Sequence, residues 1–373
     1  MIDWSLAERI AATVAGDPPH VSLGVDLAEL AADSERLVGA YTGLVPAAPL
    51  PAAEWVSRSE WVNANVGSLS GLLDPLVEHV GEGLGPLSSP LRAAAGYAIA
   101  AEVGVVFGYL GKHVLGQYEL VLLAGGPQAR SRAPGGRPTA SDEPAGSRLE
   151  HSLAPARLLF VAPNLDSAVH ELKVDREQFM HWVALHEITH ALQFGSVAWL
   201  REHLAGMLRE LLEGMSVSLD TTRALRLPTG ADLRKLAGAV GSGDLLSLMT
   251  TPEQRQLLDR VQATMAVLEG YAEHVMDAVG ADVLPSLPSL RAALNRRRSS
   301  RSAPARMLQR LLGLDLKLRQ YELGKQFCDA VARHGGIDAV NRVWTGPEAM
   351  PTLEELAQPA DWLRRTHVPV VTK

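Results

Sequence analysis

The segment His-Glu-Ile-Thr-His at positions 186–190 constrains the fold more than any other feature of the chain. Asp175 begins the surrounding segment with a helix-capping pattern, Gly195 provides a stop, and no glycine or proline lies between them, so we expect one helix. On a helix, residues four apart project within about 40° of each other. His186 and His190 therefore point to the same place, where they can share one metal ion.

The three polar residues of this motif have the chemistry of metal-assisted hydrolysis. Imidazole nitrogens bind Zn²⁺ at about 2.0–2.1 Å. Glu187 lies about 100° further round the helix than His186. Its carboxylate is then beside the ligands, where it can take a proton from a water that attacks a carbonyl. The motif predicts bound zinc, with His186 and His190 as ligands and Glu187 as the catalytic base.

A third protein ligand is expected, because catalytic zinc sites usually have three. The longer pattern His-Glu-x-x-His-x-x-Gly-x-x-His is not present, since Gln193 and Ser196 occupy its glycine and last histidine positions. A predicted helix at 252–280 offers carboxylates instead. One of them can ligate the metal and the next can orient a ligand histidine. These carboxylates share one stripe at a spacing of four residues: Glu269, Glu273 and Asp277.

Three short motifs resemble those of known metallopeptidases. Glu269-Gly-Tyr-Ala272 resembles the gluzincin helix whose glutamate is the third zinc ligand, which implies Glu269 as that ligand. Tyr321-Glu-Leu-Gly-Lys-Gln-Phe327 resembles a helix of several gluzincin families, and implies that Tyr321 stabilises an oxyanion. Together with the segment 186–194 and Leu115-Gly-Gln-Tyr118, these motifs resemble a bacterial zincin-like family of hydrolases associated with deazaflavin coenzyme biosynthesis. Residues 116–345 carry most of this resemblance, and Leu115 extends it upstream.

The glycine that follows Glu269 supports the same assignment. Without a side chain at Gly270, the second helix can approach the motif helix closely enough for a short carboxylate to reach the metal. Glu273, one turn later, is then expected to bind the free ring nitrogen of His186 or His190. Asp277 is expected to lie behind it in the same outer layer. The alternative assignment exchanges the roles of Glu269 and Glu273.

The predicted fold is mainly α (α+β), with a small sheet packed on the motif helix. Residues 1–115 are expected to form an N-terminal helical region, and residues 116–373 a zincin-like core. In the first part, a helical pattern continues from Trp55 through Val80, and residues 91–110 read as a buried helix rather than a membrane span. Strands are expected at 116–124 and 157–162, with a mobile loop at 125–150. Further helices are expected at 4–16, 26–44, 197–214, 231–239, 252–280, 304–334 and 336–344.

Composition excludes several classes of function. A hydrophobic content of 47%, with 21% charged residues, is typical of a globular protein. A net charge of −7 argues against binding to nucleic acids or anionic membranes, which need a basic surface. The N-terminus has no basic segment followed by an apolar one, so a cytoplasmic location is expected. The lone Cys328 fits a reducing compartment and reads as a small buried residue.

We expect a hydrolase that acts on peptide or other amide bonds. The long stretch 191–268 between the second histidine and Glu269 is expected to cap the cleft and restrict substrates. One alternative is a catalytically silent metalloprotein that binds or scaffolds, and another is a metal-free helical interaction protein. Glu187 argues against the former, because a structural zinc needs no base and usually has four protein ligands. The sequence predicts no particular oligomeric state.

Overall fold

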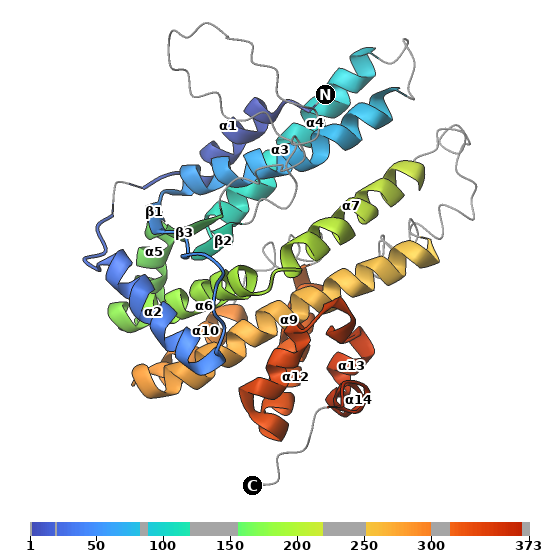
Figure 1. Ribbon diagram of the computed structural model, residues 1–373. Coiled ribbons are helices and arrows are strands. Elements are labelled where there is room, and N and C mark those ends of the chain that lie inside the picture. Colours follow the sequence, from blue (N-terminus) through green and yellow to red (C-terminus); the bar gives the residue numbers. More distant parts are fainter. Residues whose placement is uncertain are drawn as a thin grey trace, which may run out of the picture. The chain divides into compact units, whose positions relative to one another are not determined.

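The computed structural model describes residues 2–18, 21–82, 89–119, 156–218, 251–299 and 314–367 (Figure 1). Within these ranges the chain is mainly helical and has one small sheet, which confirms the predicted fold class. The chain forms two compact units. The first unit comprises Met1–Asp17, Ser57–His113 and Glu119–Ala156, and the second comprises Pro18–Val56, Val114–Tyr118 and Arg157–Lys373.

In the part of the first unit that is described, the helices are α1 (Trp4–Ala15), α3 (Arg58–Glu82) and α4 (Ser89–Gly111). α4 packs closely on α1 because glycine lies at the contact: a Cβ on Gly108 would be 2.7 Å from the Ala11 carbonyl oxygen. The sequence predicted a buried helix at 91–110. This prediction was wrong away from the contact with α1, where Tyr97 is 55% exposed. Apolar residues run all round this helix, whereas the close contact involves one face. No helix in the described ranges is long and apolar enough to cross a membrane.

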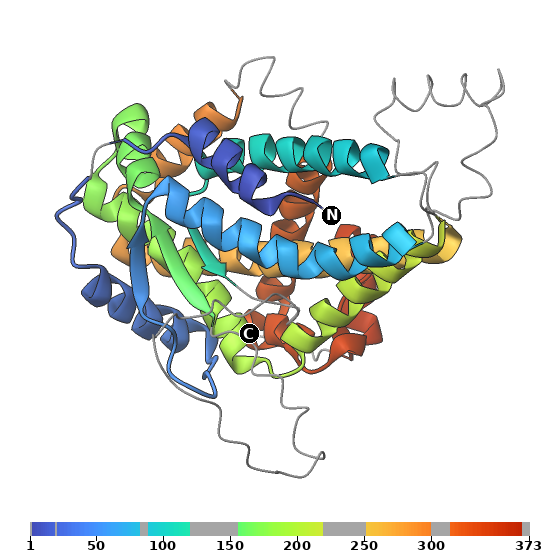
Figure 2. The ribbon, with the colours of Figure 1, turned by 90° about the horizontal axis from the view of Figure 1, so that it is seen from above.

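The second unit contains the sheet except for Glu119, the last residue of β2, and the strand order is β1-β3-β2 (Figure 2). The strands are β1 (Ala53–Val56), β2 (Gly116–Glu119) and β3 (Arg157–Val161). β1 runs parallel to β3, and Trp55 is paired with Phe160. The helical pattern predicted from Trp55 onward was therefore wrong at its start, because pairing with the buried strand β3 outweighs local helical periodicity. β3 itself confirms the strand predicted at 157–162.

Helices make up most of the second unit. α2 packs on α6, α6 packs on α9, and α9 packs on α12. The helices are α2 (Leu27–Thr42), α5 (Ala162–Leu172), α6 (Arg176–Ser196), α7 (Leu200–Ser218), α9 (Pro252–Val283), α10 (Leu287–Ser299), α12 (Leu314–Asn341), α13 (Leu353–Ala357) and α14 (Pro359–Arg365), with 3₁₀ turns η3 (Arg342–Trp344) and η4 (Pro347–Ala349).

The two units do not follow the predicted division between residues 115 and 116. Residues 18–56 group with the C-terminal part of the chain, because α2 packs on α6 and β1 pairs with β3. The mobile loop predicted at 125–150 and the helix predicted at 231–239 lie outside the described residues.

Candidate metal centre

Helix α6 contains the motif, and a capping residue and buried side chains fix its position. It begins at Arg176, where the Asp175 side chain accepts a hydrogen bond from the Gln178 backbone N–H at 2.9 Å. Met180, Ile188 and other apolar side chains along it are fully buried. This burial fixes the rotation of the helix about its axis. The directions in which residues 186–190 point are therefore set by packing.

Helix α9 carries the candidate third ligand. It begins at Pro252 after a capping box in which Thr251 and Gln254 each bind the other's backbone N–H. Glu269 lies at the middle of this helix, where α9 also packs on α6. Apolar burial on both sides of this point, at Leu268 and Ala272, holds the carboxylate in place.

Gly270 faces a different helix from the one expected. A Cβ on Gly270 would lie 2.1 Å from the backbone carbon of Gly324, in α12. A Cβ on Gly324 would lie 1.8 Å from the Ala266 carbonyl oxygen in α9. The expectation that Gly270 admits the motif helix was wrong: it admits α12 on another side of α9. The glycine pair still sets where Glu269 lies, because it determines how closely the two backbones cross.

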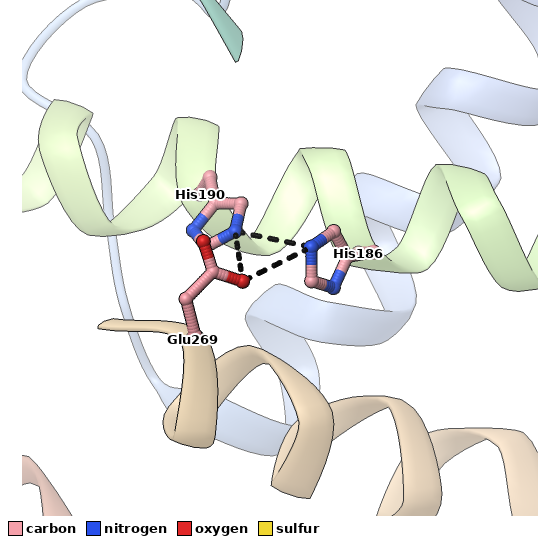
Figure 3. A group of neighbouring side chains, drawn as sticks. All are labelled: His186, His190 and Glu269. Carbon is pink, nitrogen blue, oxygen red and sulfur yellow. Dashed lines mark hydrogen bonds and ion pairs between the residues drawn. The ribbon is translucent and has the colours of Figure 1, made fainter. Parts of the chain in front are cut away.

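The three side chains predicted to bind zinc meet in one place (Figure 3). Nε2 of His186 and Nε2 of His190 are 3.2 Å apart. Oε2 of Glu269 lies 3.6 Å from the first nitrogen and 3.7 Å from the second. The three atoms thus form a nearly equilateral triangle, with two corners from α6 and one from α9.

This triangle has the size that a single zinc ion needs. Ligand atoms at about 2.0–2.1 Å from one cation, at tetrahedral angles, are separated by about 3.3–3.4 Å. The observed separations of 3.2, 3.6 and 3.7 Å differ from this by a few tenths of an ångström. Two imidazoles and one carboxylate are also a common ligand set of catalytic zinc sites, which leave the fourth position open. The residues therefore fit a catalytic type of zinc site.

The outward-facing ring nitrogens have partners that the sequence analysis missed. Nδ1 of His190 lies 2.8 Å from Oε1 of Gln193. The amide nitrogen of Gln193 in turn donates to the Leu268 carbonyl oxygen at 3.1 Å, just before Glu269. Nδ1 of His186 lies 3.0 Å from the sulfur of Met276. Neutral acceptors of this kind favour an Nδ1–H tautomer, which leaves Nε2 free to bind a metal.

Glu273 and Asp277 occupy different positions from those predicted. Asp277 forms ion pairs with Arg291 and, at 3.0 Å, with Lys325. Glu273 lies 3.8 Å from the same Arg291 guanidinium. Since a carboxylate is strongly attracted by a nearby cation, these two side chains belong to an ion-pair cluster with α10 and α12. The spacing of four residues placed them on the stripe but could not reveal these cations.

Glu187 lies beside the ligands, as its place on the helix predicts. It is 7% exposed, and its Oε2 accepts a hydrogen bond from the Tyr118 backbone N–H at 3.2 Å. Burial raises the pKa of Glu187 to about 7, because the charged form loses hydration, and the His190 imidazole opposes this rise. A carboxylate in this position can accept a proton and return it.

His190 is tuned mainly by the carboxylates around it. Burial lowers the pKa of His190, but the charges of Glu269 and Glu187 outweigh burial and raise it to about 9. The same negative charges that attract a proton attract a cation, and the two compete for one imidazole. Binding of a metal there is therefore expected to release a proton.

Tyr321 and Tyr271 lie in the two gluzincin-like motifs. Tyr321 lies in α12, but its side chain is outside the described part of the structure, so its predicted contact with an oxyanion stays a prediction. Tyr271, two residues after Glu269, is fully buried, and its hydroxyl donates to Oδ1 of Asn341 at 2.7 Å. Tyr271 therefore contributes to packing between α9 and the end of α12.

Comparisons with known proteins agree with this site. The family model of zincin-like metallopeptidases matches residues 2–363, so the chain belongs to the zincin-like metallopeptidase family. It is similar to a crystal structure of a proposed hydrolase with a novel fold from Chloroflexus aurantiacus, with 30% identity and a TM-score of 0.64. That similarity covers 99% of this chain and 100% of the other. A comparison with curated proteins found no match.

Proposed function

We propose that this protein is a zinc-dependent hydrolase of peptide or other amide bonds. One observation carries the proposal: two nitrogens and one oxygen meet in a triangle of zinc dimensions, with a buried carboxylate next to it. Membership of the zincin-like metallopeptidase family supports a metallohydrolase at the level of class. The three-ligand set argues against a purely structural zinc, which usually has four protein ligands.

Each residue of the site has a separate proposed role. A zinc ion held by His186, His190 and Glu269 would supply Lewis acidity, which polarises a carbonyl oxygen and makes water more acidic. Glu187 accepts the proton from the attacking water and delivers it to the leaving amine. Gln193 and Met276 hold the two imidazoles in the tautomer that presents Nε2. Tyr321 is proposed, from motif resemblance alone, as a donor to the oxyanion.

The substrate class rests on the same resemblance. Gluzincin-like motifs imply peptide or amide bonds, and the long stretch between His190 and Glu269 argues for restricted substrates rather than broad protein digestion. The predicted association with deazaflavin coenzyme biosynthesis likewise stays a prediction from motif resemblance. A metalloprotein that binds without turnover is the alternative, and activity of the metal-loaded protein distinguishes the two.

The test compares purified wild-type protein with Glu187→Gln and with a His186→Ala/His190→Ala double variant. Zinc content is measured for each, and hydrolysis is followed with a mixed library of fluorogenic peptides. The wild type should hold about one zinc per chain, and Glu187→Gln should keep zinc while losing activity by about 10²–10⁴-fold. The double variant should lose the metal. Stoichiometric zinc in the double variant, or equal turnover by Glu187→Gln, would overturn the proposal.

A further inference from the structure

Strand β2 runs next to the motif helix at the point where Glu187 lies. Among the described residues β2 is an edge strand of the sheet, and residues Gly116 to Tyr118 belong to the same compact unit as α6. We propose that Gly116 is a positioning residue, and that with the Tyr118 N–H it forms a backbone seat that holds the Glu187 carboxylate beside the metal ligands. This inference rests on the proposed function, because it explains how the base of that reaction is oriented.

The first observation is the lack of space at Gly116. A Cβ on this residue would lie 2.7 Å from Cγ of Glu187 and 3.0 Å from its carboxyl carbon and from Oε1. Contacts under 3.0 Å are not tolerated without movement, and Glu187 is 7% exposed, so it has little room to move. The bare backbone of Gly116 thus forms one wall of the Glu187 pocket.

The second observation is a directed hydrogen bond from the same strand. The Tyr118 N–H donates to Oε2 of Glu187 at 3.2 Å, two residues along from the glycine wall. In a strand, the backbone groups of residues two apart point to the same edge. The missing side chain at Gly116 lets Glu187 approach β2, and the Tyr118 N–H binds its carboxylate.

A third contact fixes the strand against the helix. The ring of Tyr118 stacks on Phe194, with centroids 5.9 Å apart and planes 20° apart. Phe194 lies one turn beyond His190 on α6, so the strand is anchored to the helix that carries the base and two ligands. Movement of the Tyr118 N–H relative to Glu187 is thereby restricted. Both wall and donor are backbone groups, which add no side-chain freedom to the site.

A double-mutant cycle tests the contact without depending on activity. Gly116→Ala is made in the wild type and in Glu187→Ala, which removes the Cγ atom that the new methyl group would meet. The melting temperature should fall by several degrees in the first background and change little in the second. Gly206→Ala is the matched control, because a Cβ there meets nothing within 4 Å. An equal fall in both backgrounds would overturn the proposed contact.

A kinetic arm tests the positioning role. In Gly116→Ala, kcat should fall by about 10²-fold while KM and zinc content stay as in the wild type, since displacement of a catalytic group by about 1 Å has such an effect. Unchanged kcat would overturn the positioning role. If Gly116→Ala alone does not fold, folding of the Gly116→Ala/Glu187→Ala variant supports the contact, and failure of both overturns it. If the wild type hydrolyses nothing, the proposed function fails. The double-mutant cycle on stability then tests the contact between Gly116 and Glu187 by itself.

Discussion

The two sides of α9 are built in opposite ways. On the side that faces α6, the side chains of Glu269 and Met276 contact the imidazoles of the two motif histidines. Toward α12, Gly270 and Gly324 have no side chains, and the backbones touch. The first contact brings together the three candidate metal ligands, and the second is a contact between backbones. The α9–α12 contact nevertheless influences the α9–α6 contact. The distance between the backbones at Gly270 and Gly324 sets the position of α9, and so the distance from Glu269 to the histidines.

The largest expected effect comes from filling the α12 side. In Gly270→Ala, the new Cβ would meet backbone atoms of Gly324 that no rotamer change can move. The free energy of unfolding should fall by about 3 kcal/mol, and zinc should bind more weakly because Glu269 shifts. Urea denaturation and zinc titration measure the two effects.

The matched control for this change is Gly280→Ala, also in α9. Its Cβ would make ordinary contacts of 3.4 Å with the leucine side chains of residues 284 and 287. It should be neutral or slightly stabilising, since alanine favours a helix by up to about 1 kcal/mol over glycine. Equal stability losses in the two variants would show that the crossing at Gly270 is not special.

A smaller effect is expected from the acceptors behind the histidines. Gln193→Ala removes the partner of His190 and the link to the Leu268 carbonyl, so zinc affinity should fall by about 10–100-fold. Met276→Leu keeps the volume but removes the sulfur near His186, so its loss should be smaller. Competition with a fluorescent zinc chelator measures both. A larger loss for Met276→Leu would reverse the order of importance of the two acceptors.

The smallest effect on stability is expected from a substitution in the ion-pair cluster of Asp277. Asp277→Asn breaks contacts with Arg291 and Lys325 that are partly open to water, so it should cost at most about 1 kcal/mol. Zinc affinity should stay unchanged, because the Asp277 carboxylate pairs with cations of α10 and α12. A tenfold loss of zinc affinity in this variant would return Asp277 to the outer layer of the metal site that the sequence predicted.

The same contrast explains what the sequence could predict. Residues 186–190 act through spacing on one helix, and spacing is visible in a sequence, so the convergence of the two histidines was predictable. Glu269 was identified because it also belongs to a local motif. The partners of Gly270 and Gln193 lie on other helices, and no periodicity encodes which helix will be adjacent. Trp55 was misread for the same reason, because its strand exists only through pairing with β3.

Two features of the sequence point to these contacts. Gln193 lies three residues after His190, a spacing at which side chains on a helix meet, so a candidate acceptor was visible beside the second ligand. Gly324 lies in the same quoted motif as Tyr321, and a glycine within a predicted helix often marks a close approach of another backbone. Pairing Gly270 with Gly324 would have anticipated the crossing of α9 and α12.

We expect Glu269 to complete the metal site and Glu273, one turn away, to take no part in it. Glu269→Ala and Glu273→Ala differ by one helical turn and remove the same side chain, so each is the control for the other. Both are loaded with zinc and titrated with a chelator. Glu269→Ala should release zinc at a far lower chelator concentration than the wild type, and Glu273→Ala should stay near the wild type. The reverse order, or equal retention in both variants, would contradict the assignment of Glu269 as the third ligand.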